Sequence, residues 1–301
     1  MRKGQRFTPA RLDRWERRGR GAGTRADYQP WHQVTRDDPG SRGRSHLPPW
    51  RFGRLHHLLS DEELIAFGFA SMLPGLADVR EQFPLSRDEH QAEINSYRLS
   101  SAKVLPGTLT IARELGLRHP QAKGGGTSRP WTMSTDLLLT LRDRASGPHL
   151  LAISIKYDAD LAKRRVRELL RIEQEYWRRQ DQPWLLLTPT LHSPTVAKSM
   201  LTGLPWALSI DQAPSRLIDG VGALARDIRG RTMRLALQIV GSSLCVDERM
   251  SQLALWQAIW QGRLPLDLAR PMRPDQPLEL VSTEAFWLQN PIASGRSAWT
   301  F

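Results

Sequence analysis

The middle of the chain alternates between apolar runs and a charged, amphipathic stretch. The apolar runs WTMSTDLLLTL (131–141), LLAISIK (150–156) and WLLLTP (184–189) predict three strands, and a Gly-Pro turn separates the first two. Between the second and third strands, residues 160–179 place apolar side chains at helical spacing among many charges, which predicts a long helix. The order strand, strand, helix, strand predicts an α/β core with mixed strand pairing.

Changes from polar to apolar residues mark further elements before this core. Ser60 precedes acidic residues that end in Glu63 and then an apolar segment, the form of a helix N-cap followed by a carboxylate three residues later. VREQFPL (79–85) alternates enough to predict a strand that ends near its proline. KGGGTSRP (123–130) holds three glycines, but no Gly-Lys-Ser/Thr sequence follows them. We therefore predict a flexible connector there rather than a nucleotide-binding loop.

After about residue 190 the pattern becomes mainly helical, and two short extended segments follow around a loop with proline and arginine. Helices followed by a small β-hairpin resemble a winged-helix module, a class that binds either DNA or proteins. We expect three parts: a basic N-terminal arm (1–54), a catalytic domain (55–190) and a winged-helix-like C-terminal domain (191–301). The expected C-terminal helices are 193–201, 215–229, 232–240 and 247–261, and the expected extended segments are 264–268 and 277–281.

The distribution of charge indicates a polyanionic partner. The chain of 301 residues has a formal net charge of +12, and residues 1–54 contain fourteen Lys or Arg against five Asp or Glu. Tryptophans interrupt this basic arm, which we interpret as a segment that lies on DNA with its arginines on phosphates. A solvated charged tail is the alternative. The hydrophobic share of 40% is ordinary for a globular protein, and the length allows two domains with their own cores.

Composition also excludes several classes of protein. The single cysteine, Cys245, excludes an internal disulfide, and its apolar neighbours predict a small buried side chain in a reducing compartment. No apolar run approaches the ~20 residues that span a bilayer. The first twenty residues lack the apolar stretch of a secretory signal, so we expect a cytoplasmic protein without membrane contact. The adjacent His56 and His57 have no further ligand at zinc-site spacing.

Three residues carry the candidate chemistry: Glu63 near the start of a predicted helix, Asp136 in one apolar strand, and Lys156 at the end of its neighbour. A carboxylate on one strand and a lysine ending the next is the metal-site layout of restriction-type nucleases. Carboxylates hold Mg²⁺, which lowers the pKa of bound water and neutralises charge on a phosphate. Each residue also has a structural interpretation, in which Glu63 caps its helix, Asp136 is a hydrogen-bonded polar residue, and Lys156 faces solvent.

The chemical interpretation assigns each of these residues a role. Asp136 is the expected central ligand, Glu63 reaches the same cation, and the backbone carbonyl of Ile155 adds an oxygen. Lys156 is expected beside the attacking water, where its charge stabilises negative charge that develops on the phosphate. Mg²⁺ is the expected cofactor, with Mn²⁺ as a substitute. These residues predict a metal-dependent phosphodiesterase that acts on DNA.

Several strings of residues, in a fixed order, carry a family resemblance. They are HHLLSD (56–61), REQFPL (80–85), MSTD (133–136) and YWRRQDQPW (176–184). Over about residues 20–190 the chain resembles TnsA, the family of endonuclease subunits of heteromeric two-subunit transposases. The resemblance implies a restriction-endonuclease-like N-terminal core that hydrolyses DNA at the 5′ ends of a transposon, while a separate DDE transposase cuts and joins the 3′ ends. It also implies an AAA+ ATPase regulator as a partner, engaged through the C-terminal region.

Matching by position carries the family's site onto Glu63, Asp136 and Lys156. It adds Glu173, which we interpret as a charge on a helix face rather than a helper near the site. Ser154 stands where the family has a longer polar or acidic side chain, and because a hydroxyl is a weak ligand, this argues against a fully occupied second metal site. The alternatives are a stand-alone restriction or repair-type nuclease and a non-catalytic DNA-binding adaptor between transposase and regulator. The expected DNA contacts are Arg42, Arg44, Arg51 and Arg54, with His56 and His57 in phosphate contact or packing.

Overall fold

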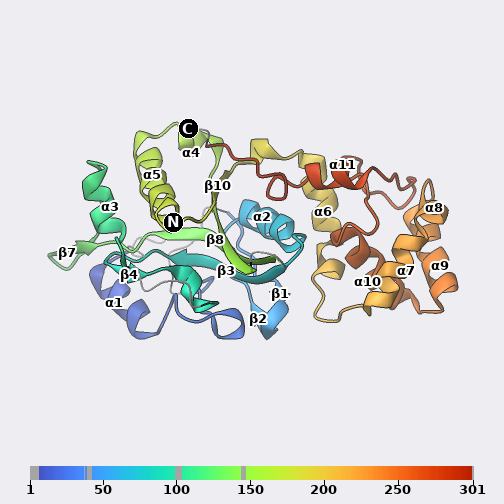
Figure 1. Ribbon diagram of the computed structural model, residues 1–301, viewed down its shortest axis with the longest axis horizontal. Coiled ribbons are helices and arrows are strands. Elements are labelled where there is room, and N and C mark those ends of the chain that lie inside the picture. The colour runs from blue at the N-terminus through green and yellow to red at the C-terminus, as the bar shows by residue number, and fades with distance from the viewer. Residues whose placement is uncertain (1–6, 37, 39–42, 99–103, 144–146, 300–301) are drawn as a thin grey trace.

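A four-stranded mixed sheet lies at the centre of the N-terminal half of the described chain (Figure 1). The strands follow the order β10-β9-β8-β3. β3 (Leu76–Pro84), β8 (Ser134–Asp143) and β9 (Gly147–Ile155) are antiparallel, and β10 (Trp184–Leu187) runs parallel to β9. The predicted α/β core with mixed pairing is therefore confirmed. The computed structural model describes residues 7–36, 38, 43–98, 104–143 and 147–299, and of Arg51 the backbone alone.

Helices cover both faces of this sheet because its central strands are apolar on both sides. α2 (Asp61–Ser71) packs on the face formed by side chains such as Leu137 and Ile153. α5 (Arg164–Arg178) and α3 (Thr108–Glu114) pack on the opposite face. The oxygen of Ser60 accepts a hydrogen bond from the Glu63 amide at 3.1 Å, so the predicted N-cap of α2 is present. The helix predicted at 160–179 is divided, because the short α4 (Asp158–Leu161) precedes α5.

Small two-stranded sheets surround the central one. The segment predicted as a flexible connector, 123–130, instead belongs to a hairpin, and that prediction was wrong. Gly125 and Gly126 have φ values of +59° and +75°, a left-handed conformation that glycine adopts without steric cost, and they form the hairpin turn. The pairs are β1 (Pro49–Trp50) with β2 (Arg54–Leu55), β4 (His90–Gln91) with β5 (Val104–Leu105), and β6 (Gln121–Gly124) with β7 (Thr127–Pro130).

The described part of the basic N-terminal arm is folded onto the sheet domain rather than separate from it. α1 (Pro9–Arg17) packs against the β6–β7 hairpin and buries Trp15 in a cluster with Trp31. Arg20 and Asp38 form an ion pair at 2.6 Å whose side chains are 4% and 5% exposed. A buried pair of this kind holds its segment in place because separating it would strand a charge. Part of the arm's charge is therefore structural.

The C-terminal half is mainly helical and contains α6 (Pro194–Ala207), α7 (Ser215–Ala223), α8 (Ala225–Ile228), α9 (Met233–Leu244), α10 (Glu248–Trp260) and α11 (Thr283–Leu288). An antiparallel bridge joins Leu266 to Leu280, within the two segments predicted to be extended, and a second joins Thr232, just before α9, to Pro277. Cys245 is exposed at the end of α9, so the prediction that it is buried was wrong. No helix in the described ranges is both long and apolar enough to cross a membrane.

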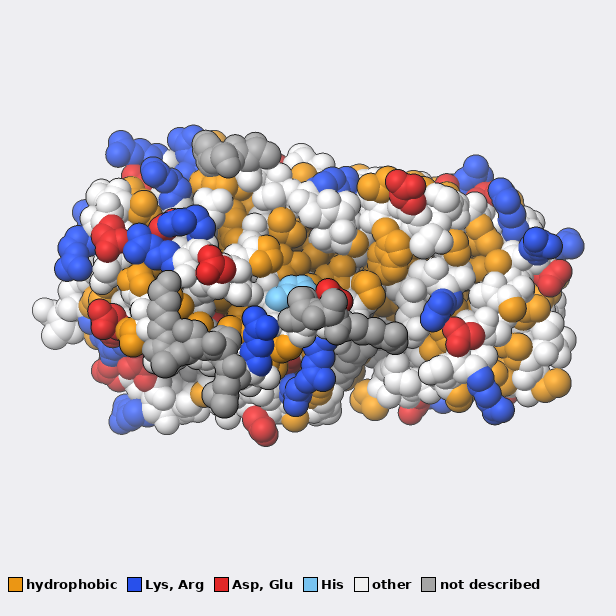
Figure 2. Space-filling view, in the orientation of Figure 1, with side chains coloured by type: hydrophobic (Ala, Val, Ile, Leu, Met, Phe, Trp, Pro, Cys, Tyr) orange, Lys and Arg blue, Asp and Glu red, His pale blue; other side chains and the backbone are white. Residues whose placement is uncertain are grey.

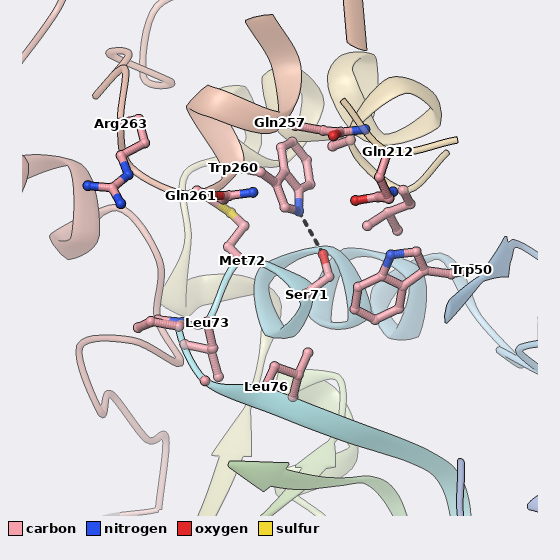
Figure 3. Close-up of a pocket in the computed structure, with 14 residues that line it drawn as sticks. Trp50, Ser71, Met72, Leu73, Leu76, Gln212, Gln257, Trp260, Gln261 and Arg263 are labelled. Atoms are coloured by element: carbon pink, nitrogen blue, oxygen red, sulfur yellow. Dashed lines mark hydrogen bonds between the residues drawn. The ribbon is translucent and has the colours of Figure 1, made fainter. Parts of the chain in front are cut away.

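The two halves share a continuous hydrophobic core across α2, α6 and α10. Figure 1 shows α6 beside α2 where the halves meet. A Cβ atom on Gly68 of α2 would lie 2.1 Å from the sulfur of Met200 in α6, so glycine permits this close approach. Trp260 Nε1 donates to Ser71 Oγ at 2.8 Å across the boundary, as Figure 3 shows. A pocket of about 410 Å³ lies beside this contact. Glu63, Asp136 and Lys156 are not among the residues that line this pocket.

Candidate active site

The two central strands bring Asp136 and Lys156 together. The Ile155 amide donates to Asp136 Oδ2 at 2.6 Å, and Lys156 Nζ donates to the same oxygen at 2.8 Å. Lys156 Nζ also donates to the carbonyl oxygen of Ile155 at 2.8 Å. One ammonium group therefore contacts two of the three groups that were expected as metal ligands. The Asp136 and Lys156 side chains are 14% and 31% exposed, so this group remains open to solvent.

Glu63 makes the helix-cap contacts of its structural interpretation and also lies near Asp136. Its carboxylate completes the cap of α2, because Oε2 accepts the Leu59 amide at 2.8 Å and Oε1 accepts from the Ser60 hydroxyl at 3.4 Å. The same buried carboxylate lies within the electrostatic influence of Asp136. Burial first, and then the charge of Asp136, raises the pKa of Glu63 to about 8.

These oxygens fit a hard divalent cation. Among the described residues, no group of three or more His, Cys, Asp and Glu is placed to hold a metal ion. Mg²⁺ does not need such a group, because it keeps several waters and binds through one or two carboxylates. The raised pKa of Glu63 reflects burial first and then repulsion by Asp136, and a nearby cation would favour the charged carboxylate against both. The contacts of Lys156 Nζ show that a positive charge is accommodated beside Asp136 and Ile155.

Glu173 is not the solvated charge on a helix face that we predicted. It is 4% exposed and points from α5 toward the sheet, where Oε1 accepts hydrogen bonds from Thr135 at 2.7 Å and from Ser154. Ser154 is fully buried and its hydroxyl also accepts from Trp184 Nε1 at 3.3 Å, so it is not placed as a metal ligand. Burial alone would lower the pKa of Lys156, but Asp136 and then Glu173 outweigh it and hold that pKa above its ordinary value.

The predicted phosphate contacts by Arg54 and His56 are contradicted by burial. Glu81 in β3 is fully buried and accepts from Arg54 Nη1 at 2.6 Å and from His56 Nδ1 at 3.1 Å. Arg54 is 10% exposed and His56 is not exposed at all. Burial alone would raise the pKa of Glu81, but the hydrogen bond and charge of His56, and then Arg54, bring it to about 2. Of the two roles expected for His56, phosphate contact and packing, its burial fits packing.

The other expected DNA contacts have different outcomes. His57 is half-buried, and its Nδ1 accepts the Val34 amide at 2.9 Å. Arg44 is 81% exposed, with an ion pair to Asp61 at 3.2 Å, so its side chain is accessible. Arg42 lies outside the described residues, and so does the side chain of Arg51.

Gln82 is a site residue that the sequence reasoning missed. Its Nε2 donates to Glu63 Oε2 at 2.9 Å, and the side chain is 3% exposed. It lies in REQFPL, a string that was noted for family resemblance but given no chemical role. The signal that could have found it is a pair of adjacent polar residues, Glu81 and Gln82, which would place one of them on the inner face of a predicted strand.

Two comparisons with known proteins bear on this site. A sequence model of the family described as "TnsA-like endonuclease N terminal" matches residues 77–189. The chain is also 31% identical over 223 residues to the Transposon Tn7 transposition protein TnsA of Escherichia coli. The aligned residues make up 73% of this chain and 70% of that protein. The chain belongs to the TnsA family. The sheet domain of this TnsA-family protein is accordingly a DNA endonuclease domain, and the chain is a transposase endonuclease subunit.

The TnsA-family match spans the central sheet from β3 to β10 and includes Asp136, Lys156 and Glu173. Glu63 precedes the matched residues, and it joins the site because α2 packs across β8 and β9. The family model therefore covers the strand and α5 residues of this group, and Glu63 is added by the packing of α2.

The raised pKa of Glu63 in this TnsA-family protein predicts a pH dependence of stability without metal. A carboxyl whose pKa rises from 4.5 to about 8 on folding binds its proton more tightly in the folded state, so the free energy of unfolding falls as pH rises between those values. His32 has the opposite effect below pH 6.5, because burial lowers its pKa to about 4. From pH 6.5 to 8 we expect a fall of up to about 2 kcal/mol. Urea unfolding with a chelator present should show this fall in wild type and not in Glu63→Gln. An equal change in the free energy of unfolding with pH in the two proteins would contradict the prediction.

Proposed function

We propose that this TnsA-family protein is a Mg²⁺-dependent endonuclease that hydrolyses the phosphodiester at the 5′ ends of a transposon during cut-and-paste transposition. The observation that carries the proposal is the position of Lys156 Nζ, 2.8 Å from both Asp136 Oδ2 and the Ile155 carbonyl oxygen. A lysine in that place lies beside the oxygens that hold a cation, where it can act on the water and phosphate bound there.

Asp136, Glu63 and the Ile155 carbonyl would hold Mg²⁺, or Mn²⁺ in its place. The bound ion would supply water of lowered pKa and neutralise charge on the phosphate. The carboxylates are ordered by the fold itself, since the Ile155 amide fixes Asp136 and the α2 cap fixes Glu63. Lys156, kept charged by its acidic neighbours, would orient the attacking water and stabilise the negative charge that grows on the phosphate.

Exposed arginines support duplex DNA as the substrate. Figure 2 shows Lys and Arg side chains gathered around α5, where Arg164, Arg167 and Arg171 face solvent. Arg44 remains a proposed phosphate contact because it is exposed near the start of α2. Contacts of this kind give affinity that depends on salt and carry no sequence preference.

We infer that the C-terminal domain is a winged-helix module that binds a protein partner. Support comes from the order of elements along the chain. The helices α7, α9 and α10 come first and the antiparallel bridge between Leu266 and Leu280 follows, as in a helix-turn-helix with a β-wing. In DNA-reading modules the last of these helices enters the major groove. Here residues 253–260 of α10 are buried against neighbouring helices, so that surface is unavailable to DNA. The proposed partner is the AAA+ ATPase regulator, alongside the DDE transposase.

The test is a map of strand breaks in a reconstituted reaction with donor DNA, transposase, regulator and Mg²⁺. We expect Asp136→Ala to lose the breaks at the 5′ ends while cutting and joining at the 3′ ends continue. The products should shift from simple insertion to a joined donor–target form. Asp158→Ala is the matched control, because Asp158 is an exposed carboxylate just past β9 that bonds Thr190. Equal 5′ breakage by wild type and Asp136→Ala would refute the assigned site.

The same experiment separates the alternatives. A stand-alone restriction or repair-type nuclease would cut bare DNA efficiently without the partners. If the protein is a non-catalytic adaptor, the reaction would need it for assembly, but Asp136→Ala would alter the breaks in neither strand. The intact Glu63, Asp136 and Lys156 constellation favours the enzyme over the adaptor.

A further inference from the structure

Gln82 occupies an unusual place in the central sheet. The pairs Glu81–Leu137 and Phe83–Thr135 flank it, so the register places Gln82 opposite Asp136 on the neighbouring strand. Its φ is +51°, a left-handed value that a non-glycine residue rarely adopts inside a strand. Such strain persists only where the surroundings impose it, and it gathers at functional sites.

Two contacts hold this distortion in place. The backbone carbonyl of Gln82 accepts the Trp31 amide at 3.2 Å, which ties the N-terminal segment to β3. The side-chain amide reaches α2 and donates to Glu63 Oε2 at 2.9 Å. The distorted backbone thus directs the side chain toward the acid on α2, whereas Ser154, across Asp136 on the other strand, turns to Glu173.

The contacts of Glu63 distinguish its two oxygens. Oε2 accepts two bonds of ordinary length, from the Leu59 amide at 2.8 Å and from Gln82. Within the described residues, Oε1 has a single, longer contact, with the Ser60 hydroxyl at 3.4 Å. Both bonds to Oε2 come from donors that the fold holds in place, whereas one of the two on Asp136 Oδ2 comes from the Lys156 ammonium, so Oε1 is the oxygen of Glu63 left for a cation.

We infer that Gln82 is a positioning residue that fixes Oε2 of Glu63 and thereby presents Oε1 to the metal, an inference that rests on the proposed function. Groups that hydrogen-bond a metal ligand set its orientation, and their loss lowers metal affinity by about 10- to 100-fold. Gln82 belongs to this class because it contacts a ligand rather than substrate.

The experiment measures Mn²⁺ affinity by calorimetry on the full chain at fixed pH, with unfolding temperature as a second readout. Gln82→Asn keeps an amide and suits a left-handed backbone, but it is one methylene too short to reach Glu63. Gln82→Met keeps the length and lacks the donor. Gln252→Met in α10 is the matched control, and Asp136→Ala tests whether Mn²⁺ binds at the site at all.

We expect both Gln82 variants to bind Mn²⁺ about 10- to 100-fold more weakly, with Gln82→Asn unfolding at the temperature of wild type. A role confined to the backbone distortion would leave the affinity of Gln82→Asn unchanged, and that result would overturn the inference. If Asp136→Ala still loses binding in that case, the proposed function survives alone. If wild type binds no Mn²⁺, or Asp136→Ala binds it equally, the proposed function and this inference both fail.

Discussion

Lys156→Met is expected to slow 5′-strand hydrolysis by about 10²- to 10³-fold and to leave Mn²⁺ binding intact or tighter. The ammonium lies 2.8 Å from both Asp136 Oδ2 and the Ile155 carbonyl oxygen. A metal ion that binds these two oxygens must therefore displace it. Removing it deletes the charge that stabilises the phosphate but spares the ligands. Single-turnover cleavage and calorimetric Mn²⁺ titration measure the two effects separately.

Lys163→Met is the control for this prediction. Lys163 is 55% exposed and pairs with Asp160 on the surface, so its loss removes the same charge away from the site. We expect it to cleave like wild type. If Lys156→Met cleaves at the wild-type rate, the lysine has no part in the mechanism. If Lys156→Met loses Mn²⁺ binding, the lysine is needed to form the site rather than for the reaction in it.

Glu81→Ala is expected to lower the free energy of unfolding by about 3–5 kcal/mol, the usual cost of breaking a buried ion pair by removing one partner. Glu81 is fully buried and binds Arg54 and His56, which are themselves 10% and 0% exposed. Its removal leaves two polar side chains in the core without their acceptor. Urea unfolding at neutral pH measures the change.

Glu175→Ala is the comparison for Glu81→Ala. Glu175 also binds two arginines, Arg178 and Arg179, but these pairs lie on the surface of α5. Exposed pairs contribute about 0–1 kcal/mol, so we expect a small change. Equal losses in the two variants would show that the Glu81 network does not anchor the β1–β2 region to β3.

The central strands and the start of α2 were predictable because local patterns decide them. Leu137, Leu138 and Leu139 are all fully buried, as expected for a strand covered on both faces, and Ser60 caps α2 as its sequence indicates. Asp136 and Lys156 could be chosen because a charge at the border of such a run needs a partner. Because β8 and β9 are antiparallel, their register brings the start of β8 next to the end of β9.

Long-range contacts account for what the sequence did not predict. The composition of the arm indicates a segment that lies on DNA or a solvated tail, and neither interpretation includes its packing. The partner of Arg20 is eighteen residues away, and α1 packs on a hairpin more than a hundred residues later. Glu173 looks like a helix-face charge because periodicity cannot show that its side of α5 meets Thr135 and Ser154. The role of Gln82 depends on a backbone distortion that no propensity indicates.

The most direct test of the central claim is a crystal structure of the full chain with Mn²⁺, with the ion located by its anomalous scattering. The account predicts one peak within about 2–2.5 Å of an Asp136 carboxylate oxygen, Glu63 Oε1 and the Ile155 carbonyl oxygen. A peak bound elsewhere, or none at a Mn²⁺ concentration that supports cleavage, would contradict it.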